Sequence, residues 1–340
     1  MKRSFGVTCL VAVSVLLSCL AVTGHAAEKV FSLKFASFMP ATTLLGQTIQ
    51  EWANEVGKRT DGRVKVTVYP GATLMPPQQT YDGITKEVAD IGYGILAYHR
   101  GRFPLTEVID LPLGYKNPSV PTKLVNAYYK KFKPKELDDV KVLFLEANGP
   151  SMLGTKKPVY NLEDLKGMKI RSHGLSAKII NTLGGSAVGM PVTEAYDAIS
   201  KGVAEGIVID WGGLYNFKFG EVVRNNTEGR AFSYSSTFYT VMNKDKWNNL
   251  PKDIQDIIDK LNEEWIEKVA NFWGDWEVMG RTELRKMGNK FIVLSEDENA
   301  RWAALLKPLL SDYVNAAKEK GLRGEEALKF CEDFLKTHDK

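Results

Sequence analysis

An arginine at the end of a predicted strand is the residue of this sequence whose chemistry is most specific. In "NLEDLKGMKIRSHG", Met168 and Ile170 alternate as the buried face of a short strand, and Arg171 follows just before a glycine turn. A guanidinium carries its N–H donors in one plane and can bind a carboxylate through two parallel hydrogen bonds. The alternative is a structural salt bridge with one of three nearby acidic residues, Glu163, Asp164 or Glu194. The residue types thus predict either a carboxylate site or an ion pair.

Residues that could support catalysis form no recognisable motif. Beyond the first 26 residues the histidines are His99, His173 and His338, and the chain has no HExxH, no CxxC and no nucleophile elbow. The glycine turns at 92–94 and 183–185 lack the spacing of a phosphate-binding loop. We therefore expect no enzyme activity, no metal and no cofactor. His173 is expected to be a solvated turn residue rather than a ligand contact.

The first 26 residues have the pattern of a secretory signal peptide. Lys2 and Arg3 precede an apolar run, and small residues follow where a signal peptidase would cleave. Cleavage after Ala26 fits best, and cleavage after Ala27 or lipid attachment at Cys19 are the alternatives. Removal of Lys2 and Arg3 lowers the formal net charge by two from +4, and Cys331 is the one cysteine left. The mature protein is expected in the periplasm, with no intrachain disulfide.

Charge and hydropathy patterning argue against nucleic-acid binding and against a membrane-spanning segment in the mature chain. Acidic and basic residues are interspersed without the basic patch that nucleic acid requires. No segment after the signal peptide approaches about 20 consecutive apolar residues, so we expect no membrane-spanning helix there.

The elements that must position Arg171 follow an α/β pattern in two lobes. Alternating strand and helix signals predict a first lobe over residues 27–150 and a second over 151–237. The chain at about 238–280 is expected to rejoin the first lobe, and about 281–340 to join the second. In the first lobe, Thr42 or Thr43 is expected to cap a helix with one apolar stripe. From Pro251 a helical pattern of roughly 35 residues would exceed 50 Å and brace both lobes.

Several of these segments resemble one family of transport proteins. "NLEDLKGMKIR" is followed by "GMPVTEAYDAISKGVAEG", and the first half contains "FASFMPATTLLGQTIQEWANEVGKRTDGRVKVTVYPGATL", "YDGITKEVADIGYG" and "GRFPLTEVIDLP". Together they resemble the solute-binding proteins of tripartite ATP-independent periplasmic (TRAP) transporters, the DctP family, over nearly the whole mature chain. The resemblance implies a two-lobed periplasmic binding protein fold that closes around a small organic acid. It also implies that Arg171 binds the carboxylate and that the partners are the membrane subunits of the transporter.

The matched positions further imply an apolar ligand pocket. Ser151 stands where members that bind sialic acid carry a second arginine, and apolar side chains replace their other polar contacts, namely Phe38, Met39, Ile95, Leu96, Val192 and Ile209. Unpaired hydroxyl groups would cost about 1 to 3 kcal/mol each there, which favours an apolar or aromatic acid. Aromatic residues near these positions could stack on a ring or pack the lobes: Phe38, Tyr98, Trp211, Tyr215 and Phe232. Asp210 could receive a ligand ammonium group or cap a helix.

Two other functions use the same fold and cleft. An extracytoplasmic sensor subunit would share the ligand and Arg171, and the sequence does not separate it from a transport receptor. A secreted enzyme is less consistent with the sequence, because the cleft candidates supply no nucleophile with a base. In either binding role the lobes are expected to close about crossings near residues 147–151 and 233–240.

Overall fold

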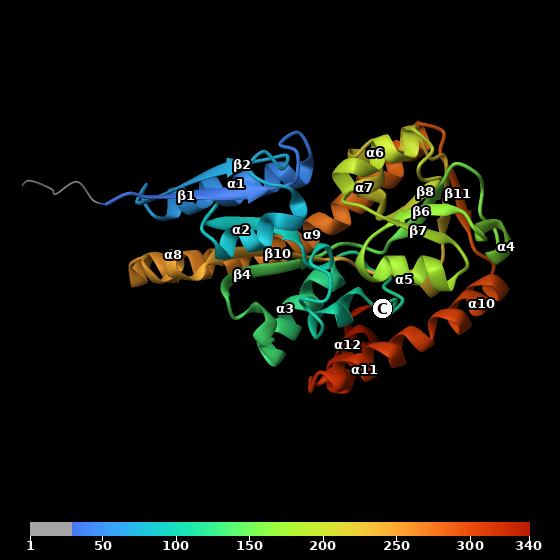
Figure 1. Cartoon of the computed structure of the whole chain (residues 1–340). Coiled ribbons are helices and arrows are strands. Elements are labelled where there is room, and N and C mark those ends of the chain that lie inside the picture. The colour runs from blue at the N-terminus through green and yellow to red at the C-terminus, as the bar shows by residue number, and fades with distance from the viewer. Residues whose placement is uncertain (1–28) are drawn as a thin grey trace, which may run out of the picture.

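A computed structural model describes residues 29–340 of the chain. The predicted signal peptide, with its cleavage and lipidation sites, lies outside the described residues. Strands form two separate sheets, each within its own lobe, and these lie at the left and right of Figure 1.

The first sheet has five strands in the order β2-β1-β3-β10-β4. Their bounds are β1 Phe31–Ser37, β2 Val64–Tyr69, β3 Ile91–Ile95, β4 Val140–Ala147 and β10 Thr237–Asn243. β10 runs antiparallel between β3 and β4, so the chain returns to the first lobe after residue 237. β4 packs against α3 (Val120–Phe132) and α9 (Lys252–Lys286), and this burial accounts for its almost unbroken apolar run.

The second sheet has six strands in the order β11-β9-β5-β8-β6-β7. Their bounds are β5 Met152–Thr155, β6 Lys169–Ser172, β7 Ser186–Gly189, β8 Gly206–Ile209, β9 Asn225–Glu228 and β11 Lys290–Val293. β6, which carries Arg171, is parallel to β7 and β8 on either side. The two sheets with their covering helices confirm the predicted α/β class and the two-lobed architecture.

The remaining helices cover these sheets. The α-helices are α1 Leu44–Arg59, α2 Thr80–Thr85, α4 Leu162–Leu165, α5 Gly174–Thr182, α6 Val192–Ser200, α7 Trp211–Asn216, α8 Lys244–Asn248, α10 Glu296–Leu306, α11 Pro308–Glu319 and α12 Gly324–His338. Short 3₁₀ segments are η1 Pro77–Gln79, η2 Leu96–Tyr98, η3 Thr106–Asp110, η4 Lys135–Leu137, η5 Phe219–Glu221 and η6 Arg230–Phe232. Thr43 is the N-cap of α1, because its Oγ1 accepts from the Gly46 N–H at 3.0 Å.

α9 is the long helix that the sequence predicts. Its 35 residues span about 52 Å at the usual rise per residue. It contacts α1, α3 and β4 of the first lobe and α7 of the second, and it runs from one lobe to the other in Figure 1. Gly280 permits the contact with α7, since a Cβ there would lie 2.4 Å from the carbonyl carbon of Trp211. The helix is therefore a common support for both lobes.

The C-terminal segment is divided between the lobes. β11 belongs to the second sheet, and α10 packs against α5 and η6 of the second lobe. α12, however, packs against α3 and η3, and its Cys331 is a free, buried thiol in the core of the first lobe. The tail that was expected to join the second lobe thus starts there and ends on the first.

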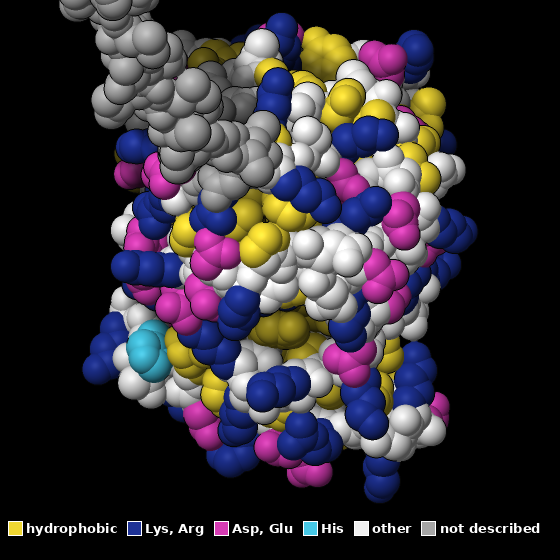
Figure 2. All heavy atoms as spheres, turned by 90° about the vertical axis from the view of Figure 1, so that its left-hand side faces the viewer, with side chains coloured by type: hydrophobic (Ala, Val, Ile, Leu, Met, Phe, Trp, Pro, Cys, Tyr) yellow, Lys and Arg dark blue, Asp and Glu magenta, His cyan; other side chains and the backbone are white. Residues whose placement is uncertain are grey.

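The surface carries charges of both signs. On the face in Figure 2, Lys and Arg side chains are interspersed with Asp and Glu side chains. Among the described helices, none has both the length and the hydropathy that crossing a bilayer demands.

Candidate functional site

A small cavity of about 50 Å³ lies between the two lobes beside Arg171. Its walls come from both lobes, from the crossing segments and from α9. The lining residues are Phe38, Met39, Leu45, Asn148, Arg171, His173, Val192, Val208, Ile209, Asp210, Gly213, Phe217, Tyr234, Ser236, Phe238, Trp273 and Trp276.

Arg171 is a buried cation that the protein holds by neutral groups. It is 1% exposed, and its Nε and Nη2 donate to the Met190 carbonyl at 3.1 and 2.8 Å. Nη2 also lies 3.5 Å from the Tyr98 hydroxyl. Within residues 29–340, Arg171 forms no ion pair, and its Nη1 has no hydrogen-bond acceptor. A buried charge is costly without an opposite charge, so this arrangement is suited to an anionic ligand.

The alternative role of Arg171 as a salt-bridge partner is not what the structure shows. Glu163 pairs instead with Arg301, at 2.8 Å between carboxylate and guanidinium. Asp164 accepts a hydrogen bond from the Tyr160 N–H at 2.9 Å. These contacts do not support the ion-pair interpretation of Arg171, and its role as a carboxylate site stays a prediction.

Tyr98 joins the lobes next to Arg171. It follows β3 in the first lobe, and its hydroxyl accepts from the Val192 N–H at the start of α6 at 3.1 Å. Its ring lies 6.1 Å from that of Phe38 and 5.3 Å from that of His173. Tyr98 therefore packs behind the cavity and links the two lobes, although it does not line the cavity.

His173 lies in the cavity wall rather than in a solvated turn. Burial and the neighbouring Arg171 charge hold its pKa well below the usual value, so the ring is neutral at pH 7. Its Nε2 lies 3.5 Å from the Ser236 hydroxyl of the crossing segment, and its buried Nδ1 has no hydrogen-bond partner within the described chain. The expectation for this histidine was wrong because the sequence does not show that the turn after β6 faces the other lobe.

Aromatic side chains form one wall of the cavity. The ring centroids of Phe38 and Tyr93 are 5.8 Å apart, those of Tyr93 and Phe238 5.7 Å, and those of Phe238 and Trp273 5.5 Å. Phe38, Phe238 and Trp273 line the cavity, and Tyr93 supports them from the sheet. A flat apolar group bound here can stack on this wall.

Asp210 caps a helix and anchors the crossing segments. Its Oδ1 accepts from the Gly213 N–H at 2.8 Å and from the Trp276 indole at 2.6 Å, and its Oδ2 accepts from Asn148 at 2.8 Å. The Asn148 Oδ1 in turn accepts from the Ser236 N–H at 2.6 Å. Of the two roles considered for Asp210, the structure shows the helix cap. The network joins both crossings to α7 and α9.

The structure brings some of the predicted site residues together and separates others. Six line the cavity: Phe38, Met39, Arg171, Val192, Ile209 and Asp210. Leu96 is buried in the core of the first lobe, and Ser151 lines a different cavity. Trp211 stacks on Phe291 with ring centroids 4.4 Å apart, and Phe232 packs 5.1 Å from Trp302. Leu96, Ser151, Trp211 and Phe232 thus lie outside the cavity.

Sequence reasoning did not identify the residues that α9 and the crossings contribute. Trp273 and Trp276 are three apart and so face one side of the helix, which is a signal the sequence contains. Asn148, Tyr234 and Ser236 lie within the two crossings that were predicted as hinges. Nothing in their local pattern indicates which side of the crossing each faces.

The described residues offer no metal site. No group of three His, Cys, Asp or Glu side chains in residues 29–340 comes together in a way that could hold an ion. The cavity lining combines the Arg171 guanidinium with aromatic and aliphatic side chains.

Comparison with known families gives one match across most of the chain. Residues 35–316 match the family model of the bacterial extracellular solute-binding protein, family 7 (DctP). This range includes every residue that lines the cavity.

Solved structures of similar proteins have the same fold. A TRAP periplasmic solute-binding protein from Desulfovibrio salexigens, in an open complex, is 34% identical, with 91% of this chain and 97% of that chain covered and a TM-score of 0.80. A marine metagenome TRAP solute-binding protein specific for aromatic acid ligands, in complex with metahydroxyphenylacetate, is 29% identical, with 91% and 100% covered and a TM-score of 0.87. One from Rhodoferax ferrireducens with copurified benzoate is 28% identical, with 90% and 98% covered and a TM-score of 0.85.

Proposed function

Because this chain belongs to family 7 of the bacterial extracellular solute-binding proteins, the receptors of TRAP transporters, we propose that its ligand is a small aromatic or otherwise apolar monocarboxylate. The receptor binds this acid in the periplasm, after removal of the signal peptide, and delivers it to the membrane subunits of the transporter. Its ligand site is the cavity beside Arg171.

The observation that carries the proposal is the buried guanidinium of Arg171. The residue is 1% exposed, and among the described residues the Met190 carbonyl and the Tyr98 hydroxyl are its hydrogen-bond acceptors. A ligand carboxylate beside Nη1 would supply the opposite charge that the described residues do not. In a low-dielectric cavity this attraction is stronger than at an open surface.

The rest of the lining supports an apolar body on the ligand. Phe38, Phe238 and Trp273 offer ring faces, and Val192 and Ile209 add aliphatic surface. A sugar acid would leave several hydroxyl groups without partners against these side chains, at about 1 to 3 kcal/mol for each unsatisfied group. The small volume also favours a compact acid.

The charge of the lining favours one carboxylate over two. Arg171 is the one Lys or Arg among the lining residues. The Asp210 carboxylate already accepts hydrogen bonds from Gly213, Trp276 and Asn148. A second carboxylate would lie unpaired near Asp210, so dicarboxylates should bind weakly.

Two relatives support the aromatic class. The metagenome protein is described as specific for aromatic acid ligands, and the Rhodoferax ferrireducens protein copurified with benzoate. They are 29% and 28% identical to this chain, and a binding assay on this chain tests whether the ligand class is shared.

The test is a thermal-shift screen of the mature protein, followed by titration calorimetry of every hit. Benzoate, phenylacetate, indole-3-acetate and phenylpyruvate are expected to raise Tm, whereas succinate, gluconate and sialic acid should not. Native mass spectrometry of the protein as purified would identify a retained ligand. Stabilisation by dicarboxylates or sugar acids alone would refute the proposed class, and a response only to short aliphatic acids would refute the aromatic part.

A further inference from the structure

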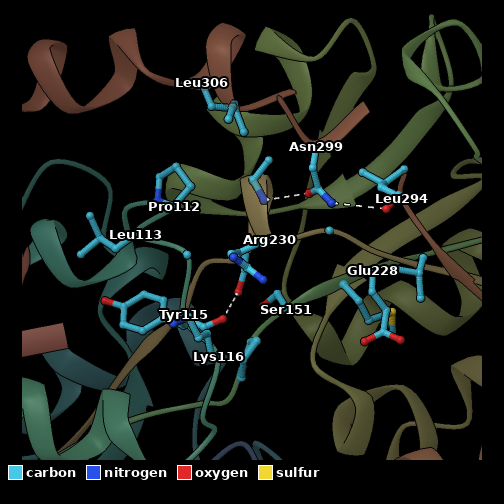
Figure 3. Close-up of a pocket in the computed structure, with 18 of the residues that line it drawn as sticks. Pro112, Leu113, Tyr115, Lys116, Ser151, Glu228, Arg230, Leu294, Asn299 and Leu306 are labelled. Carbon is cyan, nitrogen blue, oxygen red and sulfur yellow. Dashed lines mark hydrogen bonds between the residues drawn. The ribbon is translucent and has the colours of Figure 1, made fainter. Parts of the chain in front are cut away.

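A second and much larger cavity, of about 820 Å³, lies near the crossings between the lobes (Figure 3). We propose that it binds an amphiphilic organic monoanion and that this second ligand stabilises the closed arrangement of the lobes. Its walls are the loop 112–116 of the first lobe, residues 228–233 of the second, the end of α9, and helices α10 and α11.

The two cavities lie on opposite sides of the layer that joins the lobes. No residue lines both of them. Three pairs of consecutive residues are divided between them, with one member in each lining: Asp210 and Trp211, Ser233 and Tyr234, and Trp276 and Glu277. Neighbouring residues of an extended segment point to opposite sides, which places the crossing at 233–234 between the cavities.

The charges at the second cavity favour an anion. Three basic side chains that line it are exposed and form no ion pair with any described residue: Lys116, Arg230 and Lys307. Two of the three acidic lining residues, Glu228 and Glu277, share one ion-pair partner, Arg281, at 2.6 and 2.9 Å. Glu296 is the remaining acid. The four basic and three acidic lining side chains leave one positive charge in excess, which one negative charge on a ligand would balance.

The lining also offers apolar surface and unused hydrogen-bonding capacity. Pro112 and Leu113 from the loop of the first lobe and Leu306 from α10 contribute apolar side chains to its walls (Figure 3). Ser151 Oγ is buried without a hydrogen-bond partner in the described structure and belongs to the wall, so its hydroxyl can donate to a ligand anion. An acid with an apolar body matches these walls better than an inorganic anion does.

The walls are attached to the segments that must move when the lobes open. The Ser233 hydroxyl donates to the Tyr115 carbonyl at 2.8 Å, which ties the crossing to the loop of the first lobe. On the other side, Asn299 of α10 accepts from the Ala231 N–H at 3.2 Å. Because the crossing lies between the cavities, a rotation that opens the first cavity narrows the second. A ligand that fills the second cavity therefore opposes opening.

The first experiment tests the second site alone, with the fluorescent anion 8-anilinonaphthalene-1-sulfonate as the probe and the R171A variant as the protein. We expect saturable binding of one dye per protein. Ala303→Trp, which places an indole in the cavity from α10, should weaken dye binding at least tenfold. Ala316→Trp, at an exposed alanine of α11 outside the lining, is the matched control and should change it less than twofold. Replacement of both Arg230 and Lys307 by Gln should weaken it at least fivefold.

The second experiment tests the coupling, which rests on the proposed function. In stopped-flow measurements on the unmodified protein, saturating dye should slow benzoate release at least threefold, and the A303W variant should lose this effect of the dye. Dye binding that A303W leaves unchanged, or that benzoate displaces from the unmodified protein, would refute the second site. Unchanged benzoate release would refute the coupling. Failure of benzoate and the other acids to bind would refute the proposed function, while the dye titration on R171A would still decide the second site.

Discussion

Replacement of Arg171 by alanine is the most direct test of the ligand site, and the structure allows its effect to be estimated. The guanidinium is 1% exposed, so its pair with a ligand carboxylate would be largely desolvated. Truncation of one member of such a pair costs about 2 to 5 kcal/mol, which corresponds to roughly a 30-fold to 5,000-fold rise in Kd. Residual binding should remain, because the aromatic wall is intact in the variant.

The folded protein should tolerate this change. Arg171→Ala removes two hydrogen bonds to the Met190 carbonyl, worth about 1 kcal/mol each, and it also removes a buried charge whose desolvation opposes folding. These contributions have opposite signs, so the Tm without ligand should move by only a few degrees. Loss of affinity in a variant with a nearly unchanged Tm would separate binding from folding.

A double-mutant cycle assigns the effect to the charge pair. Titration calorimetry would measure benzoate and its neutral isostere benzamide against the unmodified protein and against R171A. We expect a coupling energy of at least 2 kcal/mol between the carboxylate and Arg171. Arg301→Ala, which removes a half-exposed arginine paired with Glu163, is the control and should change Kd less than twofold. A coupling energy below about 0.5 kcal/mol in folded R171A would refute the assignment.

Three further predictions concern the wall, a buried carboxyl and the interlobe helix. Phe38→Leu should lower the preference for benzoate over cyclohexanecarboxylate by about 0.5 to 1.5 kcal/mol, as measured by calorimetry, and an unchanged preference would exclude stacking on this ring. Burial raises the pKa of Glu146 to about 8, so its contribution to stability is present below the unfolded value near 4.5 and is lost as pH rises to 8. Glu146→Gln should therefore stabilise the protein more at pH 8 than at pH 5 in urea unfolding, by at most about 4 kcal/mol, and a difference independent of pH would contradict this. Gly280→Ala should destabilise the protein by about 1 to 3 kcal/mol, because the added Cβ would lie 2.4 Å from the Trp211 backbone. Gly274→Ala on the same helix is the control and should not destabilise it, because the nearest atom to its Cβ would be the Ser119 hydroxyl at 3.3 Å. Equal thermal shifts of the two variants would contradict the close contact.

The order of helices and strands could be predicted because it depends on local periodicity. The apolar stripe of α1, the alternation in β1 and β2, and the 35-residue pattern of α9 are each complete within one segment. The sequence also singled out Arg171, which lines the cavity, because a cation at the end of a buried strand needs either an ion-pair partner or an anionic ligand. These features do not require knowledge of how the lobes face each other.

The composition of the cavity could not be predicted in the same way, because it depends on the direction of side chains in neighbouring residues. Asp210 and Trp211 are consecutive, yet Asp210 lines the cavity beside Arg171 and Trp211 lies between Phe291 and Arg281 on the other side. A one-residue error in register exchanges such faces. Phe238 and Trp273 reach the wall from segments far away in the sequence, so no local pattern connects them to Arg171.

The position of Arg171 also bears on when the lobes close. In the structure the guanidinium is buried beside Tyr98 of the opposite lobe, and it forms no ion pair with a described carboxylate. Closure without an anion must therefore desolvate a cation that remains unpaired, and closure around a carboxylate does not have this cost in full. A ligand shifts a conformational equilibrium only by its difference in affinity for the two states, and here the carboxylate supplies that difference because it interacts most strongly with the desolvated charge.

We therefore expect Arg171 to couple binding to closure as well as to anchor the ligand. A neutral isostere such as benzamide would occupy the same wall but should close the lobes less completely, and small-angle scattering at saturating concentrations of each compound would measure this. Equal contraction by benzoate and benzamide would show that the ring alone drives closure.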